Sequence, residues 1–313
     1  MFSRKKYCKN TIFSCVHTNE CEMSLSKYLI QDTELMLECL KLGIKLLISP
    51  NFNSNREIVL FIVKNNGWDL QYASAELRVD REVVLTAIKN DGLALKFVSS
   101  ELRADREIVL FAVKNNGWAL QYANYELCAD REIVLEAVKN CGYALLYASN
   151  ELRDNREVVF EAVKCDGRIF AYLSEDFRNN RELILEGIKT YVNLLNWVSA
   201  NWCNDREIIL TAVKNDAYTL QFASAELRAD REIVLEAVKT NGWMLKYAST
   251  ELRADREIVL AAIKNCGLAI VYANTKLRRD PEIILEAIKC DQNALVQIDK
   301  NLQSKFKKFI TWE

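Results

Sequence analysis

The sequence predicts an all-α fold, an α-solenoid built from tandem 25-residue repeats that each contain two short helices. Half of the 313 residues are hydrophobic, and two prolines with nine glycines leave little material for the many turns of an all-β protein. A glutamate recurs every 25 residues from Glu57 to Glu282 without a gap, and a lysine follows each one seven residues later. A fixed period of this size is typical of solenoids, whose stacked units share one continuous core.

The first helix of each repeat has a clear start. In the repeat of residues 230–254, Asp230 stands directly before the segment REIVLEAVK, and the equivalent position is Asp or Asn in every full copy. The ten cap positions are Asn55, Asp80, Asp105, Asp130, Asn155, Asn180, Asp205, Asp230, Asp255 and Asp280. These side chains can accept hydrogen bonds from the free amides of a first helical turn, so we expect an N-cap here.

The pattern inside that segment predicts an amphipathic helix of about ten residues. Ile233, Val234, Ala237 and Val238 fall on one helical face, and charged residues occupy the other face. The segment ends at an Asn-Gly pair in several copies, and we expect this glycine to adopt the left-handed conformation that terminates many helices.

A second helix should follow, carrying Trp243, Leu245 and Tyr247 in the same repeat. Aromatic residues recur at the first and last of these positions, and we expect them to form the core between repeats, although aromatic rows can also stack on nucleic-acid bases. The recurring aromatics are Trp68, Trp118 and Trp243 with Tyr72, Tyr122 and Tyr247. A Ser, Asn or Asp then follows in all ten copies, which predicts a second cap before a short turn.

These patterns divide the chain into three regions. Residues 1–30 are expected to form an N-terminal arm or capping segment, residues 31–300 an array of about eleven repeats, and residues 301–313 a C-terminal cap or tail. The first repeat, "DTELMLECLK" at 32–41, is degenerate. The copy around Thr190–Asn204 is the most divergent, and we expect a local bend or an altered surface there.

The repeated segment "REIVLEAVKNNGWALQYASEELRAD" resembles the consensus of the helical repeat family known as domain of unknown function 4116. The match covers roughly residues 32–302 and recurs ten times in phase, which makes it specific. The resemblance implies helical repeats of uncharacterised role, found in giant viruses, amoeba-associated intracellular bacteria and some protists. It implies no activity and no catalytic residue.

Neither the composition nor the motifs of the sequence favour an enzyme. The formal net charge of −1 supplies no overall field for nucleic acid or an anionic membrane. The sequence lacks the motifs of phosphate loops, zinc proteases and serine hydrolases, and ten copies of one carboxylate indicate a scaffold, because a catalytic site is normally singular. We therefore expect no catalytic residue and no cofactor. Scattered cysteines and the lack of a signal peptide or transmembrane segment favour the cytoplasm or nucleus.

One cluster could bind a metal. Cys8, Cys15, His17 and Cys21 supply the ligand types of a zinc site, and His17 is the only histidine in the chain. The close pair of cysteines usual in such sites is missing, however. The alternative, an ordinary arm without metal, is favoured.

Residues at the same position of successive repeats form what we call a column, and the charged columns have a structural interpretation. The recurring Glu and Lys should form a solvated face with charge ladders between repeats. The arginine after each cap opposes the helix dipole, so we expect it to pair either with a Glu251-type residue in the turn or with the Asp cap of a neighbouring repeat.

We therefore interpret the chain as a non-enzymatic repeat scaffold that binds another protein along an extended surface, one that could be host-directed in a virus or intracellular microbe. Phe61 and Phe111 are candidate contacts, because they replace an exposed glutamate. Variable positions of the second helix are further candidates: Lys96, Gln121, Leu146, Asn196, Gln221 and Lys246. The alternative is a helical-repeat nucleic-acid-binding protein, which would need a continuous basic stripe.

Overall fold

The structure is a computed structural model that describes residues 37, 41, 53–297, 303 and 306. Throughout these residues the regular structure is helical, without a strand, as the sequence predicts. The chain divides into two compact units, residues 1–165 and 166–313. The predicted arm at residues 1–30 lies outside the described residues, and so do most of the degenerate first repeat and of the C-terminal tail.

Each repeat contains a ten-residue α-helix, a shorter 3₁₀ helix and a third short segment. In unit 1 the α-helices are α4 (Arg56–Asn65), α5 (Arg81–Asn90), α7 (Arg106–Asn115), α8 (Arg131–Asn140) and α10 (Arg156–Cys165). The 3₁₀ helices are η1 (Gly67–Tyr72), η2 (Gly92–Phe97), η3 (Gly117–Tyr122) and η5 (Gly142–Tyr147). The third segments include α6 (Ser100–Arg103), η4 (Leu127–Ala129) and α9 (Asn150–Arg153).

Unit 2 repeats the same order of elements. Its ten-residue helices are α12 (Arg181–Thr190), α13 (Arg206–Asn215), α14 (Arg231–Thr240), α15 (Arg256–Asn265) and α16 (Pro281–Cys290). Its 3₁₀ helices are η6 (Gly167–Tyr172), η7 (Val192–Asn196), η9 (Ala217–Phe222), η11 (Gly242–Tyr247) and η13 (Gly267–Tyr272). The third segments are α11 (Glu175–Arg178), η8 (Ala200–Asn204), η10 (Leu227–Ala229), η12 (Leu252–Ala254) and η14 (Leu277–Arg279), and α17 (Ala294–Gln297) follows α16.

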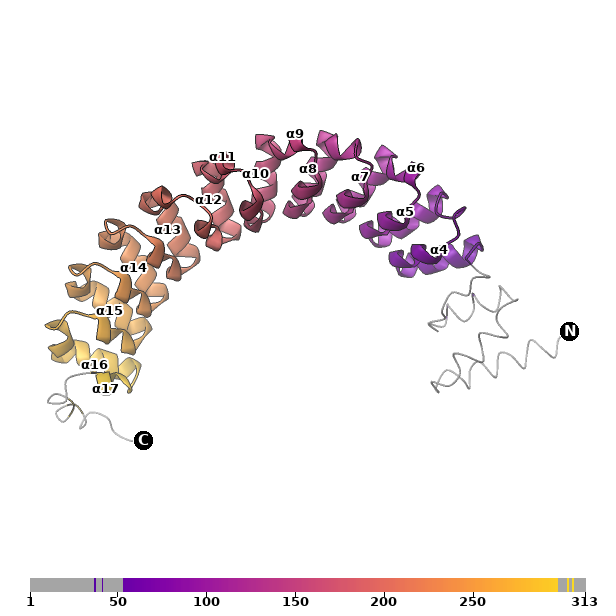
Figure 1. Cartoon of the computed structure of the whole chain (residues 1–313). Coiled ribbons are helices and arrows are strands. Elements are labelled where there is room, and N and C mark those ends of the chain that lie inside the picture. The colour runs from indigo at the N-terminus through magenta and orange to yellow at the C-terminus, as the bar shows by residue number, and fades with distance from the viewer. Residues whose placement is uncertain (1–36, 38–40, 42–52, 298–302, 304–305, 307–313) are drawn as a thin grey trace, which may run out of the picture. The chain divides into compact units, whose positions relative to one another are not determined.

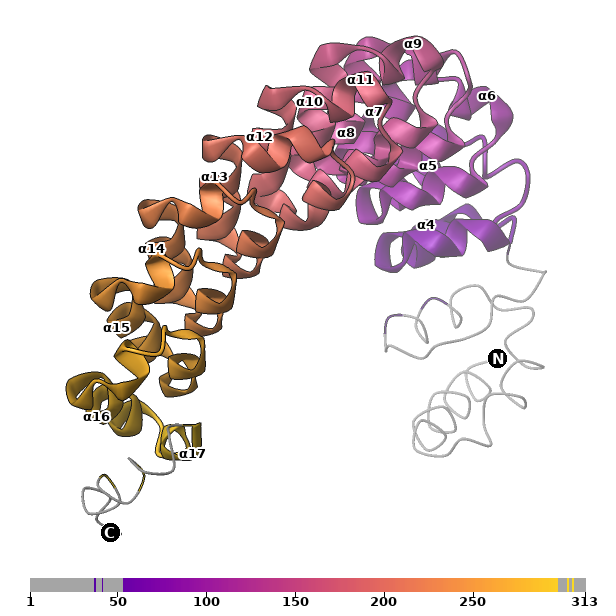
Figure 2. The same ribbon diagram turned by 60° about the vertical axis from the view of Figure 1, so that its left-hand side comes forward.

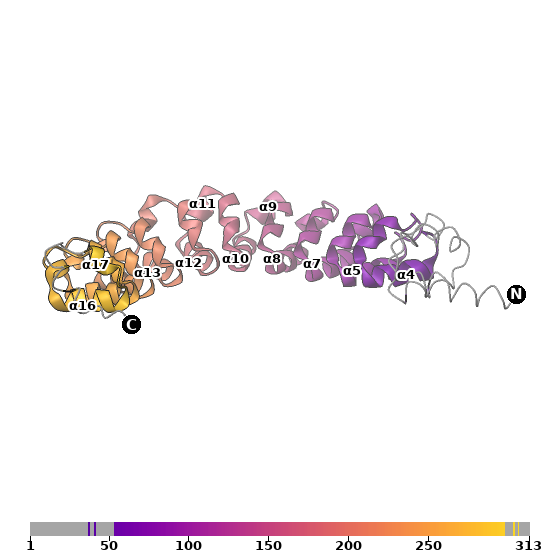
Figure 3. The ribbon, with the colours of Figure 1, turned by 90° about the horizontal axis from the view of Figure 1, so that it is seen from below.

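Within each unit the helices stack in layers. Successive ten-residue helices lie side by side. Except after η7, successive 3₁₀ helices do so too, and each later α-helix packs on the 3₁₀ helix of the preceding repeat. Figures 2 and 3 show the same layering from two other directions. A short α-helix and a six-residue 3₁₀ helix are marginal alone, so this stacking supplies the stability of each repeat.

The predicted apolar face of the α-helix forms the core. Ile233, Val234, Ala237 and Val238 of α14 are fully buried, and the other ten-residue helices bury the equivalent positions. Burying one side chain of the size of valine or isoleucine contributes about 1.5–3 kcal/mol. The predicted cap is confirmed as well, because Oδ1 of Asp230 accepts hydrogen bonds from the amides of Glu232 at 3.0 Å and Ile233 at 3.1 Å.

The second helix differs from the predicted one in type. It is a 3₁₀ helix with three residues per turn, so positions three apart share a face. In η11, Gly242 and Leu245 therefore face the core, and Trp243 and Lys246 face outward. The prediction that Trp118, Trp243 and Tyr72 are core residues is wrong, because their exposed fractions are 36%, 38% and 50%.

The glycine after the α-helix also has a role other than the predicted one. Asn116, which follows α7, is extended at φ −149° and ψ 111°, and Gly117 is outside the left-handed region. A Cβ on Gly117 would overlap the carbonyl oxygen of Ala137 in the next repeat and lie 2.9 Å from the Cβ of Cys141. Glycine is therefore required by the close approach of two repeats, and not by its backbone dihedral angles.

Candidate functional site

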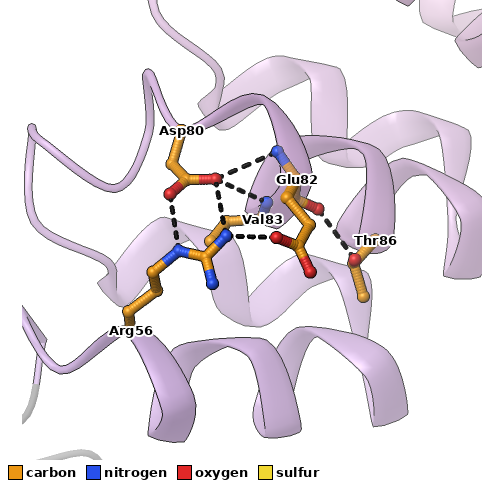
Figure 4. Close-up of polar contacts among 5 residues, drawn as sticks. All are labelled: Arg56, Asp80, Glu82, Val83 and Thr86. Atoms are coloured by element: carbon orange, nitrogen blue, oxygen red, sulfur yellow. Dashed lines mark hydrogen bonds and ion pairs between the residues drawn. The ribbon is translucent and has the colours of Figure 1, made fainter.

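The arginine column forms a ladder of ion pairs between repeats. The Nε of Arg56 lies 2.8 Å from Oδ2 of Asp80, and its Nη2 contacts Oε2 of Glu82, as Figure 4 shows. The same Asp80 caps α5 through its other oxygen, which accepts from the amides of Glu82 and Val83. One carboxylate thus caps its own helix and binds the arginine of the preceding repeat. Of the two expected partners, the Asp cap is confirmed, and the second partner is the first-turn glutamate instead of a Glu251-type residue.

The ladder continues within each unit. In unit 1, Arg106 pairs with Asp130 at 2.8 Å, and in unit 2, Arg206 pairs with Asp230 at 2.8 Å. Arg256 pairs with Asp280 at 2.9 Å, and the next repeat carries Pro281 at the arginine position. The arginines and carboxylates of the ladder therefore already pair with each other within the chain, so few of them are available to bind another protein.

The ladder has an electrostatic consequence for the cap carboxylates. The hydrogen bond from Arg56 is the largest of the effects that hold the pKa of Asp80 below its ordinary value of 3.8, and Arg181 does the same for Asp205. A carboxylate with a depressed pKa stabilises the folded chain above its unfolded pKa, and this contribution is lost as the pH falls through the folded pKa.

We therefore expect the urea midpoint of the full chain to stay constant between about pH 5 and 8 and to fall from about pH 5 to pH 3. The variant Asp80→Asn with Asp205→Asn should show a shallower fall, because asparagine caps the helix but does not titrate. Asn180 already caps α12 in this way, accepting from Leu183 at 3.0 Å. Equal acid sensitivity of the variant and the wild type would exclude these carboxylates as the cause.

A second set of contacts joins the repeats, and the sequence analysis missed it. Asn140, the last residue of α8, accepts a hydrogen bond from the amide of Gly117 at 2.7 Å and donates one to the carbonyl of Lys114 at 3.3 Å. We call this pair of bonds the Asn clamp. In unit 2, Asn265 does the same with Gly242 and Lys239, at 2.8 and 3.1 Å. The recurrence of Asn one residue after the periodic lysine was the available signal.

The Asn clamp depends on the glycine. Thr190 replaces the asparagine next to Gly167 and still accepts its amide at 2.8 Å. Within the described residues, Val192 and Ala217 replace the glycine, and neither amide makes this bond across repeats. Asn215 instead donates to the carbonyl of Ile188, and Thr240 bonds within its own helix.

The outward side of the 3₁₀ helices forms an aromatic surface in each unit. We call it the 3₁₀ face and define it by the positions equivalent to Trp68, Gln71 and Tyr72. In unit 1, Trp118 stacks on Tyr143 of the next repeat at 5.9 Å between ring centroids, and Trp68 meets Phe97 edge to face at 5.4 Å. In unit 2, the rings of Trp243 and Tyr272 are 5.9 Å apart. The rings therefore contact each other across repeats while one side stays open to solvent.

The six variable candidates of the second helix lie in the middle column of the 3₁₀ face. Lys96, Asn196, Gln221 and Lys246 are exposed, whereas Gln121 and Leu146 are half-buried. The Nζ of Lys96 lies 5.8 Å from the ring centre of Trp68, and that of Lys246 lies 4.5 Å from the ring centre of Tyr247. The column thus places a different side chain against a similar aromatic neighbour in successive repeats.

The two phenylalanine candidates lie on a different surface, the outer side of the α-helices in unit 1. Phe111 on α7 is 40% exposed, and Phe61 on α4 is half-buried. The residue between them in the column is Thr86 on α5, whose hydroxyl donates to the carbonyl of Glu82 at 2.7 Å. The structure thus brings the two phenylalanines onto one side of neighbouring helices but does not bring them to the 3₁₀ face.

The divergent copy in unit 2 has an altered surface. Its 3₁₀ helix η7 ends at Asn196, and Trp197 stacks on Tyr191 at 5.6 Å. An open recess beside it is lined by Asn179, Ser199, Asn201, Trp202, Asn204 and Asp205. Trp202, which stands where most other copies have Leu, is among the residues that line this recess.

The remaining candidates concern metal and membrane. The zinc candidates Cys8, Cys15, His17 and Cys21 lie outside the described residues. Among the residues that the structure describes, no group of three or more His, Cys, Asp or Glu side chains is placed to hold a metal ion. No helix in the same part of the chain combines the length and the apolar composition needed to cross a membrane.

Comparison with known proteins supports the family resemblance. A family model matches five consecutive segments, residues 55–103, 105–153, 155–203, 205–253 and 255–303, and each segment spans two of the 25-residue repeats. No curated protein and no solved structure matches the chain. Because the five segments make up most of its 313 residues, the chain belongs to the family described as Domain of unknown function (DUF4116).

Proposed function

We propose that the chain is a non-enzymatic scaffold that binds another protein along the 3₁₀ face. The observation that carries this proposal is the presence of exposed aromatic side chains on that face in each unit: Trp118 and Tyr147 in unit 1 leave 36% of their surface open, and Trp243 in unit 2 leaves 38% open. Aromatic residues are enriched at protein interfaces because they bury a large area with few rotatable bonds. The variable column beside them would supply specificity.

The contacts between repeats support a structural role for the recurring polar residues and a binding role for the 3₁₀ face. The recurring Arg, Asp and Glu residues form the ladder, and the recurring Asn and Gly form the clamp, so these columns have structural partners. The side chains of the 3₁₀ face differ from repeat to repeat, as a surface adapted to one irregular partner would. A nucleic-acid reader would need a continuous basic row, but the middle column of the 3₁₀ face in unit 1 runs Gln71, Lys96, Gln121, Leu146.

The test is affinity capture from the native host cell with the full chain, followed by binding of the captured protein in purified form. The variant Lys96→Glu with Lys246→Glu should weaken that complex by about tenfold or more, because two exposed charges of the 3₁₀ face are reversed. The matched control is Lys276→Glu, a reversal of the exposed lysine directly before η14 in unit 2. Equal binding by all three proteins would overturn the assignment of the 3₁₀ face.

The salt dependence of the same complex separates protein from nucleic acid. A protein complex built on aromatic contacts should lose less than about tenfold in affinity between 50 and 200 mM salt, whereas a complex with six phosphate contacts loses about a thousandfold. A captured oligonucleotide with the steeper dependence would replace the proposed function with the nucleic-acid alternative.

A further inference from the structure

One column of unit 1 loses its glutamate in three successive α-helices. The residue four positions after the recurring first-turn glutamate is Glu136 in α8 and Glu161 in α10. In α4, α5 and α7 the same position holds Phe61, Thr86 and Phe111. The outer side of these three helices therefore differs from that of the next two.

The exchange also removes an ion-pair partner. Lys139 and Lys164 lie 3.8 and 3.9 Å from the glutamates three residues before them, Glu136 and Glu161. Lys64, Lys89 and Lys114 occupy the same position in α4, α5 and α7, are exposed, and follow Phe, Thr and Phe. The recurring lysines of three successive ten-residue helices therefore lack the glutamate with which Lys139 and Lys164 pair. We call Phe61, Thr86, Phe111 and these three lysines the Phe–Lys patch.

The net charge of the helices changes accordingly. Each of α4, α5 and α7 carries one Arg, one Lys and one Glu, a net charge of +1, whereas α8 and α10 carry a second Glu and are neutral. The arginines are bound in the ladder, where Arg81 lies 2.6 Å from Asp105 and 2.5 Å from Glu107. The caps Asp80 and Asp105 offset one of these charges each, so the patch is distinguished by exposed lysines that lack the glutamate three residues before them.

The patch is also hollowed. Leu85, Thr86 and Lys89 of α5 line an open recess together with Phe111 of α7, and the ladder residues Arg81, Glu82 and Glu107 form the rest of its wall. Leu60, Leu85 and Leu110 are half-buried beside the column. Residues three and four apart share a helical face, so each lysine lies next to the Phe or Thr of its own helix.

We propose that the Phe–Lys patch binds an acidic segment of a partner protein that also carries aromatic or aliphatic side chains. The apolar side chains of the segment would cover Phe111 and the recess, and its carboxylates would pair with the three lysines. With helices about 8–10 Å apart, the lysines span about 20 Å, so the carboxylates must be spread over several residues. A nucleic-acid strand fits less well, because it carries no aliphatic side chain to fill the recess beside Leu85 and Phe111.

This site is separate from the 3₁₀ face and does not depend on the function proposed for it. The two surfaces lie on different layers of unit 1, and no variant used for one changes a residue of the other. Loss of binding at one surface with retention at the other would therefore show which proposal fails.

The direct test uses the full chain and defined fluorescent probes. The first is a 14-residue peptide of Glu, Leu and Phe, ordered so that a helix would separate acidic and apolar faces. The second has Lys in place of Glu, the third has Ser in place of Leu and Phe, and the fourth is a 20-nucleotide single strand of DNA. We expect the first peptide to bind at least about tenfold more tightly than the other three. Failure of the first peptide to bind, or tighter binding of any other probe, would overturn the proposal.

The variant Phe61→Glu, Thr86→Glu, Phe111→Glu restores the glutamate column and should weaken binding of the first peptide by at least about tenfold. It should fold, because α8 and α10 carry glutamate at this position, and circular dichroism would verify this. The matched control is Thr211→Glu on α13 of unit 2, which makes the same substitution in the same column outside the patch and should bind as the wild type does. Unchanged binding by the triple variant would contradict the proposal.

A second variant tests the charges without altering the apolar residues. The triple variant Lys64→Ala, Lys89→Ala, Lys114→Ala should bind the acidic peptide at least about tenfold more weakly than the wild type does. The salt dependence of this binding should also be smaller. In the opposite direction, Glu136→Phe should extend the patch onto α8 and tighten binding. A triple lysine variant that binds the acidic peptide as tightly as the wild type would exclude charge pairing at this site.

Discussion

Replacing Gly117 with alanine should lower the free energy of unfolding by about 2–4 kcal/mol, one of the largest effects of any single methyl group in this chain. The added Cβ would overlap the carbonyl oxygen of Ala137, a backbone atom that cannot move without its helix. Separation of η3 from α8 would also break the bond between the Gly117 amide and Asn140. Urea unfolding of the full chain, with hydrogen exchange of α7 and α8, would measure the loss and locate it.

Unit 2 provides the control for this substitution. Ala217 stands at the glycine position, is 3% exposed, and faces a repeat in which Thr240 replaces the clamp asparagine. We expect Ala217→Gly to change stability by less than about 1 kcal/mol, because the freer unfolded chain and the lost methyl group oppose any bond from the amide to Thr240, of the kind that Gly167 makes with Thr190. The combination Ala217→Gly with Thr240→Asn should form a new Asn clamp and raise stability. A Gly117→Ala variant as stable as the wild type would show that the repeats can separate freely at this point.

Replacing Asn140 with alanine should cost about 1–3 kcal/mol, because it leaves the buried amide of Gly117 without an acceptor. Asn140→Thr should cost less, since Thr190 accepts the equivalent amide of Gly167 at 2.8 Å. The same urea and hydrogen-exchange measurements apply. Equal losses in the alanine and threonine variants would assign the effect to the bond with the Lys114 carbonyl instead.

A double-mutant cycle tests whether the glycine and the asparagine act as one unit. The combined variant Gly117→Ala with Asn140→Ala should lose less stability than the two single losses added together, with a coupling of about 1 kcal/mol or more. Additive losses would mean that the close approach and the hydrogen bond contribute independently.

The sequence predicted the parts of the fold that depend on a side chain's own chemistry. The caps could be inferred because only Asp and Asn occupy those positions, and the core of α14 could be inferred because its apolar residues recur at helical spacing. The partner of the arginine was only half predicted. The dipole argument showed that it must have a carboxylate partner, but two carboxylates met that requirement equally well in the sequence.

The errors have physical causes. In a six-residue segment, three residues per turn and 3.6 residues per turn select different faces, and the sequence alone did not show which applies to Trp243. A glycine after a helix can serve a left-handed cap or a close contact, and the difference for Gly117 lies in the next repeat, 20 residues away. The Asn clamp was missed for the same reason, because both its partners belong to the preceding repeat.

For the candidate surfaces, the sequence identified which repeat positions vary, but not which of their side chains lie together. The exchange of glutamate for Phe61 and Phe111 was visible in the period, and so was the variable column of Lys96 and its equivalents. That the lysines beside the phenylalanines lose their partners became clear only from the distances of Lys139 to Glu136 and Lys164 to Glu161.

The ion-pair ladder gives the chain a direction. Where the cap is Asp, a repeat offers carboxylates to the repeat before it, and its own arginine pairs with the repeat after it, as Arg106 does in unit 1 and Arg206 does in unit 2. Loss or gain of one 25-residue repeat between two Asp-capped repeats of a unit would therefore leave an arginine facing the same carboxylate partners. Pro281 has no guanidinium, and positions 305 and 307, one period after Asp280 and Glu282, are lysines. The ion pair of the ladder is therefore not repeated between these positions.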